Sequence, residues 1–247
     1  AKQTDEETVI QGLYHSTAGA LAENAKQEIN ANNLANVNTP GFKRDIPVFR
    51  VRPTEIVEDH LFPREKNAIQ ESVGGGLFVH ETVTDFSQGA IEQTGNEFDL
   101  AIDGRGFFAV QGDNGETLYT RAGNLAVGVD NTLVTQDGHR VLSRGGQPIP
   151  LEEIENFRVG RDGTVYNGNE PVANVGVFDF ADYKSLSKIG QNLFRARGPA
   201  ELSTRFQVRQ QALEGSGVNP VTEMVRVISA FRAYEANMQM IRNQDRN

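Results

Sequence analysis

The sequence predicts an α+β protein in which both chain ends form one discontinuous, coiled-coil-like helical domain and an all-β domain is inserted between them. Both ends carry apolar residues at helical spacing, and the middle alternates apolar and polar residues between Gly, Asn and Asp turns. We expect a terminal helical domain at 1–42 and 215–247, an extended connector with short strands at 43–96 and 201–214, and a β-rich domain at 97–200.

The first expected helix runs from about Thr8 to Leu34, a stretch without proline. The Asn-rich segment that follows can satisfy the last helical carbonyls, Pro40 cannot continue a helix, and Gly41 can adopt a positive φ. The helix therefore ends before Pro40. Its apolar side chains recur at spacings of three, four and eight residues and form one narrow stripe, which comprises Ile10, Leu13, Tyr14, Ala18, Leu21, Ala25 and Ile29.

The middle of the chain predicts short strands. Phe98, Leu100 and Ile102 alternate with polar or small residues, and turn pairs such as Asp137-Gly138 recur at short intervals, which is typical of a small sandwich or barrel. In the connector we expect one or two strands, near Leu77–Val83 and Ala90–Gln93.

The second expected helix begins after Asn219, which is a good N-cap. Pro220 fits the first helical position, and Glu223 lies in the first turn, where the helix dipole favours an anion. Val227, Phe231, Tyr234, Met238 and Ile241 follow at steps of four and three, and Val221, Met224 and Ile228 form a flanking row. The pattern indicates a coiled-coil-like seam with a second apolar edge.

Composition excludes several classes of protein. Lys and Arg number 24 and Asp and Glu number 33, a net charge of −9, which disfavours nucleic-acid binding. The chain has no cysteine, so disulfides, thiolate catalysis and thiolate metal sites are excluded. The N-terminus has no apolar signal-peptide core, and no apolar run approaches the ~20 residues that span a bilayer, so we expect no direct membrane insertion.

No catalytic, metal or cofactor site is expected. The four histidines, His15, His60, His80 and His139, show no ligand spacing. A carboxylate pair for glycoside hydrolysis could in principle come from the aspartates of the middle region, but most stand beside Gly or Asn in turns. These aspartates are Asp99, Asp103, Asp113, Asp130, Asp137 and Asp162.

Three blocks of the sequence resemble the flagellar axial proteins that build the rod and hook of the bacterial flagellum. The run Ala31 to Phe42, ANNLANVNTPGF, resembles their N-terminal signature, and the runs 213–220, LEGSGVNP, and 232–237, RAYEAN, resemble their C-terminal signature. A middle block at 98–108 and 119–124 is similar to their β-domain. Residues 1–8, a polar extension, and Gly217, where Asn is common, depart from the family pattern.

The resemblance implies a structural subunit of the flagellar basal-body rod that polymerises through its terminal helices and transmits torque across the periplasm. Its partners would be copies of itself, other rod and hook proteins and the flagellar export apparatus, with no cleaved signal peptide. The compact length favours a proximal-rod subunit, and a distal-rod or hook-type paralogue is the alternative. The candidate interface residues are Leu13, Leu21, Ile29, Asn32, Asn33, Leu34, Asn36, Asn38, Gly41, Phe42, Met224, Val227, Ile228, Phe231, Tyr234, Met238 and Ile241.

Alternatives stay open for both ends of the chain. The Asn-rich block could serve helix termination alone or subunit contact as well, and the seam of the second helix could be the core of a monomeric bundle or an interface between protomers. An isolated helix pair gains little stability in water, so we expect the ends to order mainly on assembly. A secreted β-rich adhesion protein is the alternative from another class, and a carbohydrate-active enzyme is a weaker one.

Overall fold

The computed structural model describes residues 2–51, 77–151 and 156–244 and is mixed α+β. The chain divides into two compact units. Unit 1 consists of residues 1–35, 45–85 and 219–247, and unit 2 consists of residues 36–44 and 86–218. The sequence assigned 36–42 to the helical domain and 45–85 to a connector, but the structure groups the first range with the strands and the second with the helices.

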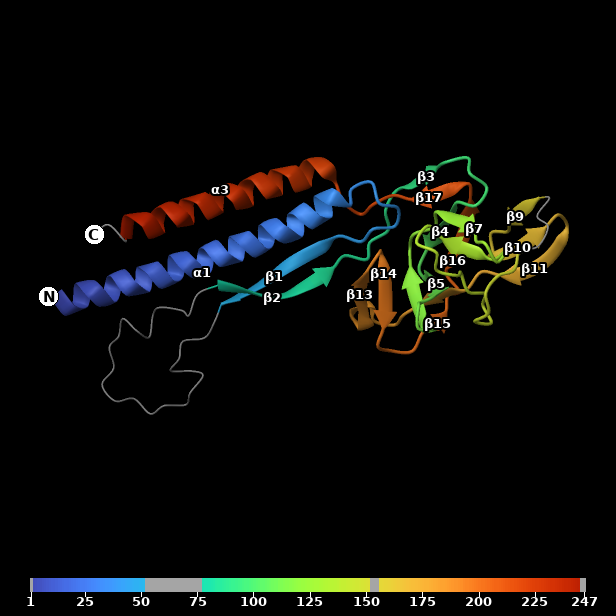
Figure 1. The fold of residues 1–247 in the computed structure, drawn as a ribbon, viewed down its shortest axis with the longest axis horizontal. Coiled ribbons are helices and arrows are strands. Elements are labelled where there is room, and N and C mark those ends of the chain that lie inside the picture. Colours follow the sequence, from blue (N-terminus) through green and yellow to red (C-terminus); the bar gives the residue numbers. More distant parts are fainter. Residues whose placement is uncertain (1, 52–76, 152–155, 245–247) are drawn as a thin grey trace. The chain divides into compact units, whose positions relative to one another are not determined.

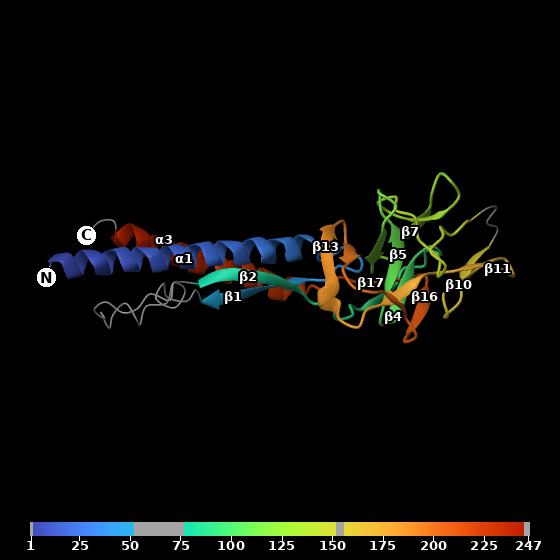
Figure 2. The same cartoon turned by 90° about the horizontal axis from the view of Figure 1, so that it is seen from below.

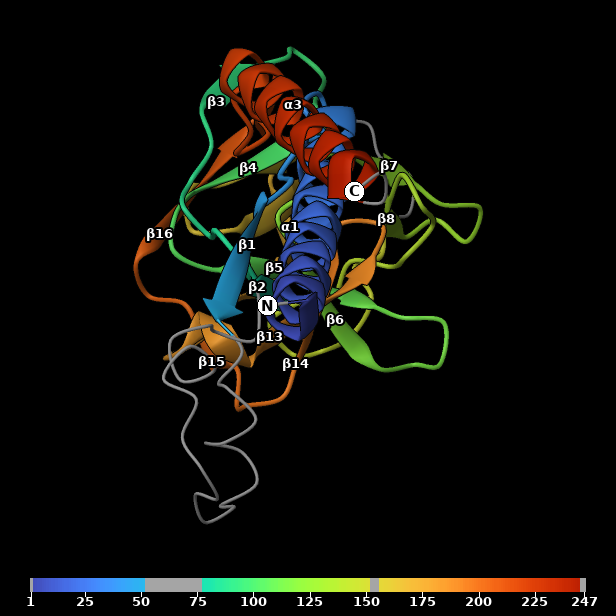
Figure 3. The same cartoon turned by 90° about the vertical axis from the view of Figure 1, so that its left-hand side faces the viewer.

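Unit 1 is built from two long helices and a two-stranded ribbon. Helix α1, Lys2–Ala35, and helix α3, Pro220–Gln244, run antiparallel and side by side, so both termini lie at the same end of the pair (Figures 1 and 3). The strands β1, Asp45–Val51, and β2, Leu77–Thr84, pair antiparallel and lie along α1 (Figure 2).

The expected start of the first helix at Thr8 was wrong. Helix α1 begins at Lys2, because the sequence between Lys2 and Thr8 contains neither Pro nor Gly to break a helix. The expected end was correct. The helix stops at Ala35, and Gly41 takes a φ of 67° in the turns that follow.

The start of α3 confirms the capping prediction. The Thr222 amide donates to the Asn219 side-chain oxygen at 3.0 Å, and the Glu223 amide donates to the Asn219 carbonyl at 3.0 Å. The sequence had not predicted β1. That strand tolerates Pro47 because the ribbon has only two strands, and a register shift after Val48 bends it.

Unit 2 is antiparallel throughout its described part. A six-stranded sheet has the order β13-β14-β6-β5-β12-β15, a three-stranded sheet has the order β11-β10-β9, and three two-stranded pairs join β16 to β4, β17 to β3 and β7 to β8. The strands are β3 Ile91–Gln93, β4 Leu100–Gly104, β5 Phe107–Gln111, β6 Thr117–Thr120, β7 Leu125–Val127, β8 Leu133–Thr135, β9 Phe157–Val159, β10 Thr164–Asn167, β11 Glu170–Asn174, β12 Val177–Asp179, β13 Leu186–Gly190, β14 Leu193–Ala196, β15 Glu201–Leu202, β16 Phe206–Gln210 and β17 Ala212–Glu214, with a short 3-10 helix η1 at Tyr183–Ser185.

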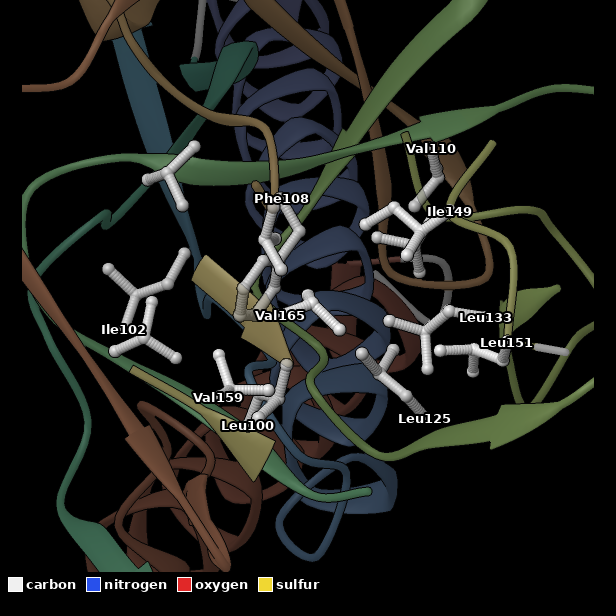
Figure 4. Close-up of a cluster of buried hydrophobic side chains, with 14 of the residues drawn as sticks. Leu100, Ile102, Phe108, Val110, Leu125, Leu133, Ile149, Leu151, Val159 and Val165 are labelled. Atoms are coloured by element: carbon white, nitrogen blue, oxygen red, sulfur yellow. The ribbon is translucent and has the colours of Figure 1, made fainter. Parts of the chain in front are cut away.

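Unit 2 has an apolar core on each face of β5. Phe108 and Val110 point to one side, where aliphatic side chains from β4, β7, β8, β9 and β10 converge (Figure 4). Phe107 and Ala109 point to the other side, into a second cluster with Phe180 and Phe194. Alternate residues of a strand face opposite sides of the sheet. Because all four of these β5 residues are buried, β5 lies between the two apolar cores of the unit.

Candidate assembly surface

The described side chains that α1 and α3 bury most deeply are small or polar. Ala230 of α3 is fully buried, and a Cβ added to Gly19 of α1 would lie 3.3 Å from the side-chain nitrogen of Asn237. Close approach of two helices needs small residues of this kind at the crossing. The fully or nearly buried residues of α1 with described side chains are Ser16, Ala20, Ala22, Asn30 and Asn33.

Asn33 joins three elements of unit 1. Its side-chain nitrogen donates to the Asp45 carbonyl at 2.8 Å and its oxygen accepts from the Asp45 amide at 2.9 Å, which fixes the start of β1. The same nitrogen lies 3.2 Å from the carboxylate of buried Glu223 on α3, and Arg226 pairs with that carboxylate at 3.2 Å. Asn33 is fully buried, so in this structure its side chain serves contacts within the subunit.

Large apolar side chains of α3 lie on the face turned to solvent. Val221 is 70% exposed and Phe231 is 47% exposed, although both are residues that ordinarily lie in a core. Steps of three and four residues place the whole set on one side of the helix. We call this set the α3 row; it consists of Val221, Met224, Val225, Ile228 and Phe231.

The expected seam of α3 divides between two faces. Val227, Tyr234, Met238 and Ile241 are half-buried, whereas Phe231 belongs to the α3 row. Fully buried Ala230 occupies the contact face beside it. Successive residues of a helix are rotated by about 100°, so Ala230 and Phe231 face different surroundings. The sequence pattern alone did not separate Phe231 from the half-buried residues of the seam.

The other candidate residues at the first helix are dispersed. Leu21, Asn32 and Asn38 are exposed, and Ile29, Leu34 and Asn36 are half-buried. The side chain of Leu13 lies outside the described part of the structure. Asn36 accepts from the Thr39 hydroxyl at 3.0 Å, a contact that supports the turn after α1.

Gly41 and Phe42 are buried inside unit 2. The Gly41 amide donates to the Glu214 carbonyl at 2.7 Å, and a Cβ at Gly41 would lie 2.4 Å from the carbonyl carbon of Arg121. The residue is therefore restricted to glycine by its φ and by this close approach of two backbones.

Four of the six candidate aspartates in unit 2 accept hydrogen bonds from neighbouring side chains. Asp99 accepts from Thr94 at 2.6 Å, and Asp103 pairs with Arg209 at 2.5 Å. Hydrogen bonds from Thr132 and Arg140 lower the pKa of Asp130, and those from Thr164 lower the pKa of Asp162. The pKa values of Asp130 and Asp162 are thus lowered, whereas a general acid needs a raised pKa.

The described residues contain neither a cluster of three or more potential metal ligands nor a helix long and apolar enough to cross a membrane. His60, one of the four histidines of the sequence, falls outside the described residues.

Three family models match this chain. One, described as flagella basal body rod protein, matches residues 13–43. A second, described as flagellar hook protein FlgE/F/G D1 domain, matches residues 101–167, and a third, described as flagellar basal body rod FlgEFG protein C-terminal, matches residues 209–247.

Curated relatives match over nearly the whole chain. The chain is 35% identical to the flagellar basal-body rod protein FlgF of Caulobacter vibrioides, with 94% of this chain and 92% of the relative covered. It is 31% identical to the flagellar basal-body rod protein FlgG of Agrobacterium fabrum, with 96% of each covered. It is 30% identical to FlgF of Mesorhizobium japonicum, with 93% of this chain and 91% of the relative covered.

Proposed function

The chain belongs to the flagellar basal-body rod protein family, a family of structural proteins and not of enzymes, and we propose that it polymerises through its terminal helices into the rod and transmits torque across the periplasm. The observation that carries this proposal is the exposed apolar α3 row. The described side chains that the two helices bury most deeply are small or polar, and the α3 row faces solvent. Such a pair gains most of its stability from a further partner.

The partner that we propose for the α3 row is a second copy of this chain. Residues 1–34 carry two basic and five acidic side chains, a net of −3, whereas residues 219–247 carry four basic and three acidic side chains, a net of +1. The charges favour contact of α3 with α1 of a neighbouring subunit. A contact between two different surfaces that does not close into a ring generates a helical filament.

The magnitudes favour growth at a tip over free dimerisation. Fully burying one large apolar side chain contributes about 1.5–3 kcal/mol, so five half-exposed ones contribute on the order of 5 kcal/mol. Association costs roughly 4–15 kcal/mol in lost translational and rotational freedom. One such contact therefore leaves a weak dimer, whereas a subunit that meets several neighbours at a growing end is held firmly.

Within the family we propose the FlgF type, the proximal-rod subunit, over the FlgG type, the distal-rod subunit. The identity of 35% to a FlgF relative, against 31% to a FlgG relative, supports this choice. As a rod subunit, the protein would contact other rod and hook proteins and would reach its place through the flagellar export apparatus. Restored motility in a strain that lacks FlgF, but not in one that lacks FlgG, tests the assignment.

The interface is tested by Phe231→Asp. A carboxylate in the α3 row would have to be desolvated on assembly without a partner, so we expect the variant to remain a folded monomer that no longer enters the rod. Val129→Asp is the matched control, because Val129 is a fully exposed apolar residue of unit 2. Normal rod formation by Phe231→Asp would contradict the interface, and loss of assembly by both variants would point to a general effect of added charge.

A further inference from the structure

Three charged side chains from distant parts of the sequence meet in the interior of unit 2. The ammonium nitrogen of Lys43 lies 2.6 Å from one carboxylate oxygen of Glu214, and Arg121 lies 3.3 Å from the other. The side chains are exposed by 0% for Lys43, 1% for Glu214 and 5% for Arg121. We call them the buried triad. No sequence pattern predicts them, because an ion pair between residues so far apart leaves no periodic signal.

Backbone groups add further hydrogen bonds to the buried triad. Lys43 also donates to the Ser87 carbonyl at 2.6 Å, and the Gly89 amide donates to the Glu214 carboxylate at 2.9 Å. Arg121 donates to the carbonyls of Ile102 at 3.1 Å and Gly104 at 2.6 Å. Buried charges with this many partners are costly to remove singly, because each leaves an uncompensated charge behind.

The buried triad holds a short segment of chain that we call the strap, residues 40–43. The Gly41 amide donates to the Glu214 carbonyl at 2.7 Å, and the Phe42 carbonyl accepts from the Gly217 amide at 2.8 Å.

The hairpin of β13 and β14 holds the strap as well. Asn192 donates to the Pro40 carbonyl at 2.7 Å, and the Lys188 ammonium lies 4.3 Å from the centre of the Phe42 ring and donates to the Lys43 carbonyl.

These contacts join, within unit 2, the segments that lie next to each boundary between the two units along the chain. The chain crosses after residues 35, 44, 85 and 218. The strap lies between the first two crossings, Ser87 and Gly89 follow the third, and Glu214 and Gly217 precede the fourth. A well-packed apolar cluster would stabilise unit 2 as well or better, so stability alone does not explain three buried charges.

We propose that the buried triad is a conformational clasp, which locks the strap and the other crossing segments to one another inside unit 2. Because ion pairs and hydrogen bonds are directional, the clasp fixes one register of these segments where apolar packing would permit several. Opening it would release the crossing segments while leaving the two apolar cores of the unit closed. The inference rests on contacts within unit 2 and does not require that the chain polymerises.

The test is amide hydrogen exchange on the full chain with the variants Lys43→Met and Glu214→Gln. Exchange at Gly41, Gly89 and Gly217 should accelerate by about tenfold or more, because their protection requires the clasp to be closed. Exchange at Ala109 and Leu142, whose amides donate to the carbonyls of Gly176 and Ala109, should change by less than about threefold. Arg195→Met, which removes the exposed 2.6 Å pair with Glu116, is the control and should leave all five amides unchanged.

Equal acceleration at all five amides would overturn the proposal, because the buried triad would then be an ordinary part of the core. Unchanged exchange at the three glycines would overturn it too. If both variants fail to fold, Lys43→Gln keeps a donor for the Ser87 carbonyl without the charge, and it must show the same local pattern. Loss of the whole unit in that milder variant would also overturn the clasp.

Discussion

The helix pair of unit 1 and the strands of unit 2 distribute their apolar residues in opposite ways. In α3, Phe231 is exposed while its neighbour Ala230 is fully buried, whereas in β5 both Phe107 and Phe108 are fully buried. Unit 2 therefore has closed apolar cores, whereas the helix pair leaves the five large apolar side chains of the α3 row exposed. One chain thus combines a closed β-rich body with an exposed apolar helix face, which is the face that we propose for assembly.

The largest expected effect contrasts two phenylalanines. Phe108→Ala would leave a cavity in the core of unit 2 and should lower its free energy of unfolding by about 3–5 kcal/mol. Phe231→Ala, at a half-exposed position, should lower the stability of the monomer by less than about 1 kcal/mol and still weaken assembly. Chemical denaturation of both purified variants measures the difference. Equal destabilisation would show that Phe231 belongs to a core of the monomer.

Gly41→Ala should have the next largest effect. The added Cβ would lie 2.4 Å from the backbone of Arg121 at a φ of 67°, so the strap must shift, and we expect unit 2 to lose roughly 2–3 kcal/mol. Gly115→Ala is the control: its φ is 77°, but nothing lies within 4 Å of the added carbon, and about 1 kcal/mol is expected. Thermal unfolding of the two variants measures the loss of stability in each. Similar losses would mean that the close approach to Arg121 is unimportant.

Asn33→Ala should have a smaller effect that is confined to unit 1. The substitution leaves the amide and carbonyl of Asp45 without their partner and should cost about 1–3 kcal/mol. Asn24→Ala, on the exposed side of the same helix, removes a 3.0 Å contact with Glu28 and should cost no more than about 0.5 kcal/mol. The helical circular dichroism signal on heating reports both. A loss in assembly without a loss in stability would instead make Asn33 a subunit contact.

The end of α1 and the start of α3 could be predicted from sequence, since each depends on a few adjacent residues. Asn219 and Pro220 begin α3, and Pro40 with Gly41 prevents α1 from continuing. The early start of α1 was missed because the polar residues before Thr8 have no apolar period, although nothing in them opposes a helix.

Features that depend on distant residues could not be predicted. β1 forms despite Pro47 because β2 pairs with it and α1 packs against the ribbon, and the partition of Val227 and Phe231 between two faces of α3 follows from where α1 lies. The resemblance blocks contained Arg121 and Glu214 and ended one residue before Lys43, yet only the fold brings these side chains together.

The most direct test of the central claim is amide hydrogen exchange compared between the monomer and the assembled polymer, followed separately for α1, α3 and unit 2. We predict rapid exchange of α1 and α3 in the monomer, strong protection of both in the polymer, with the largest gain around the α3 row, and protection of β5 in both states. Equal protection of α3 in the two states would contradict the account, because the helix pair would then be complete without a neighbour.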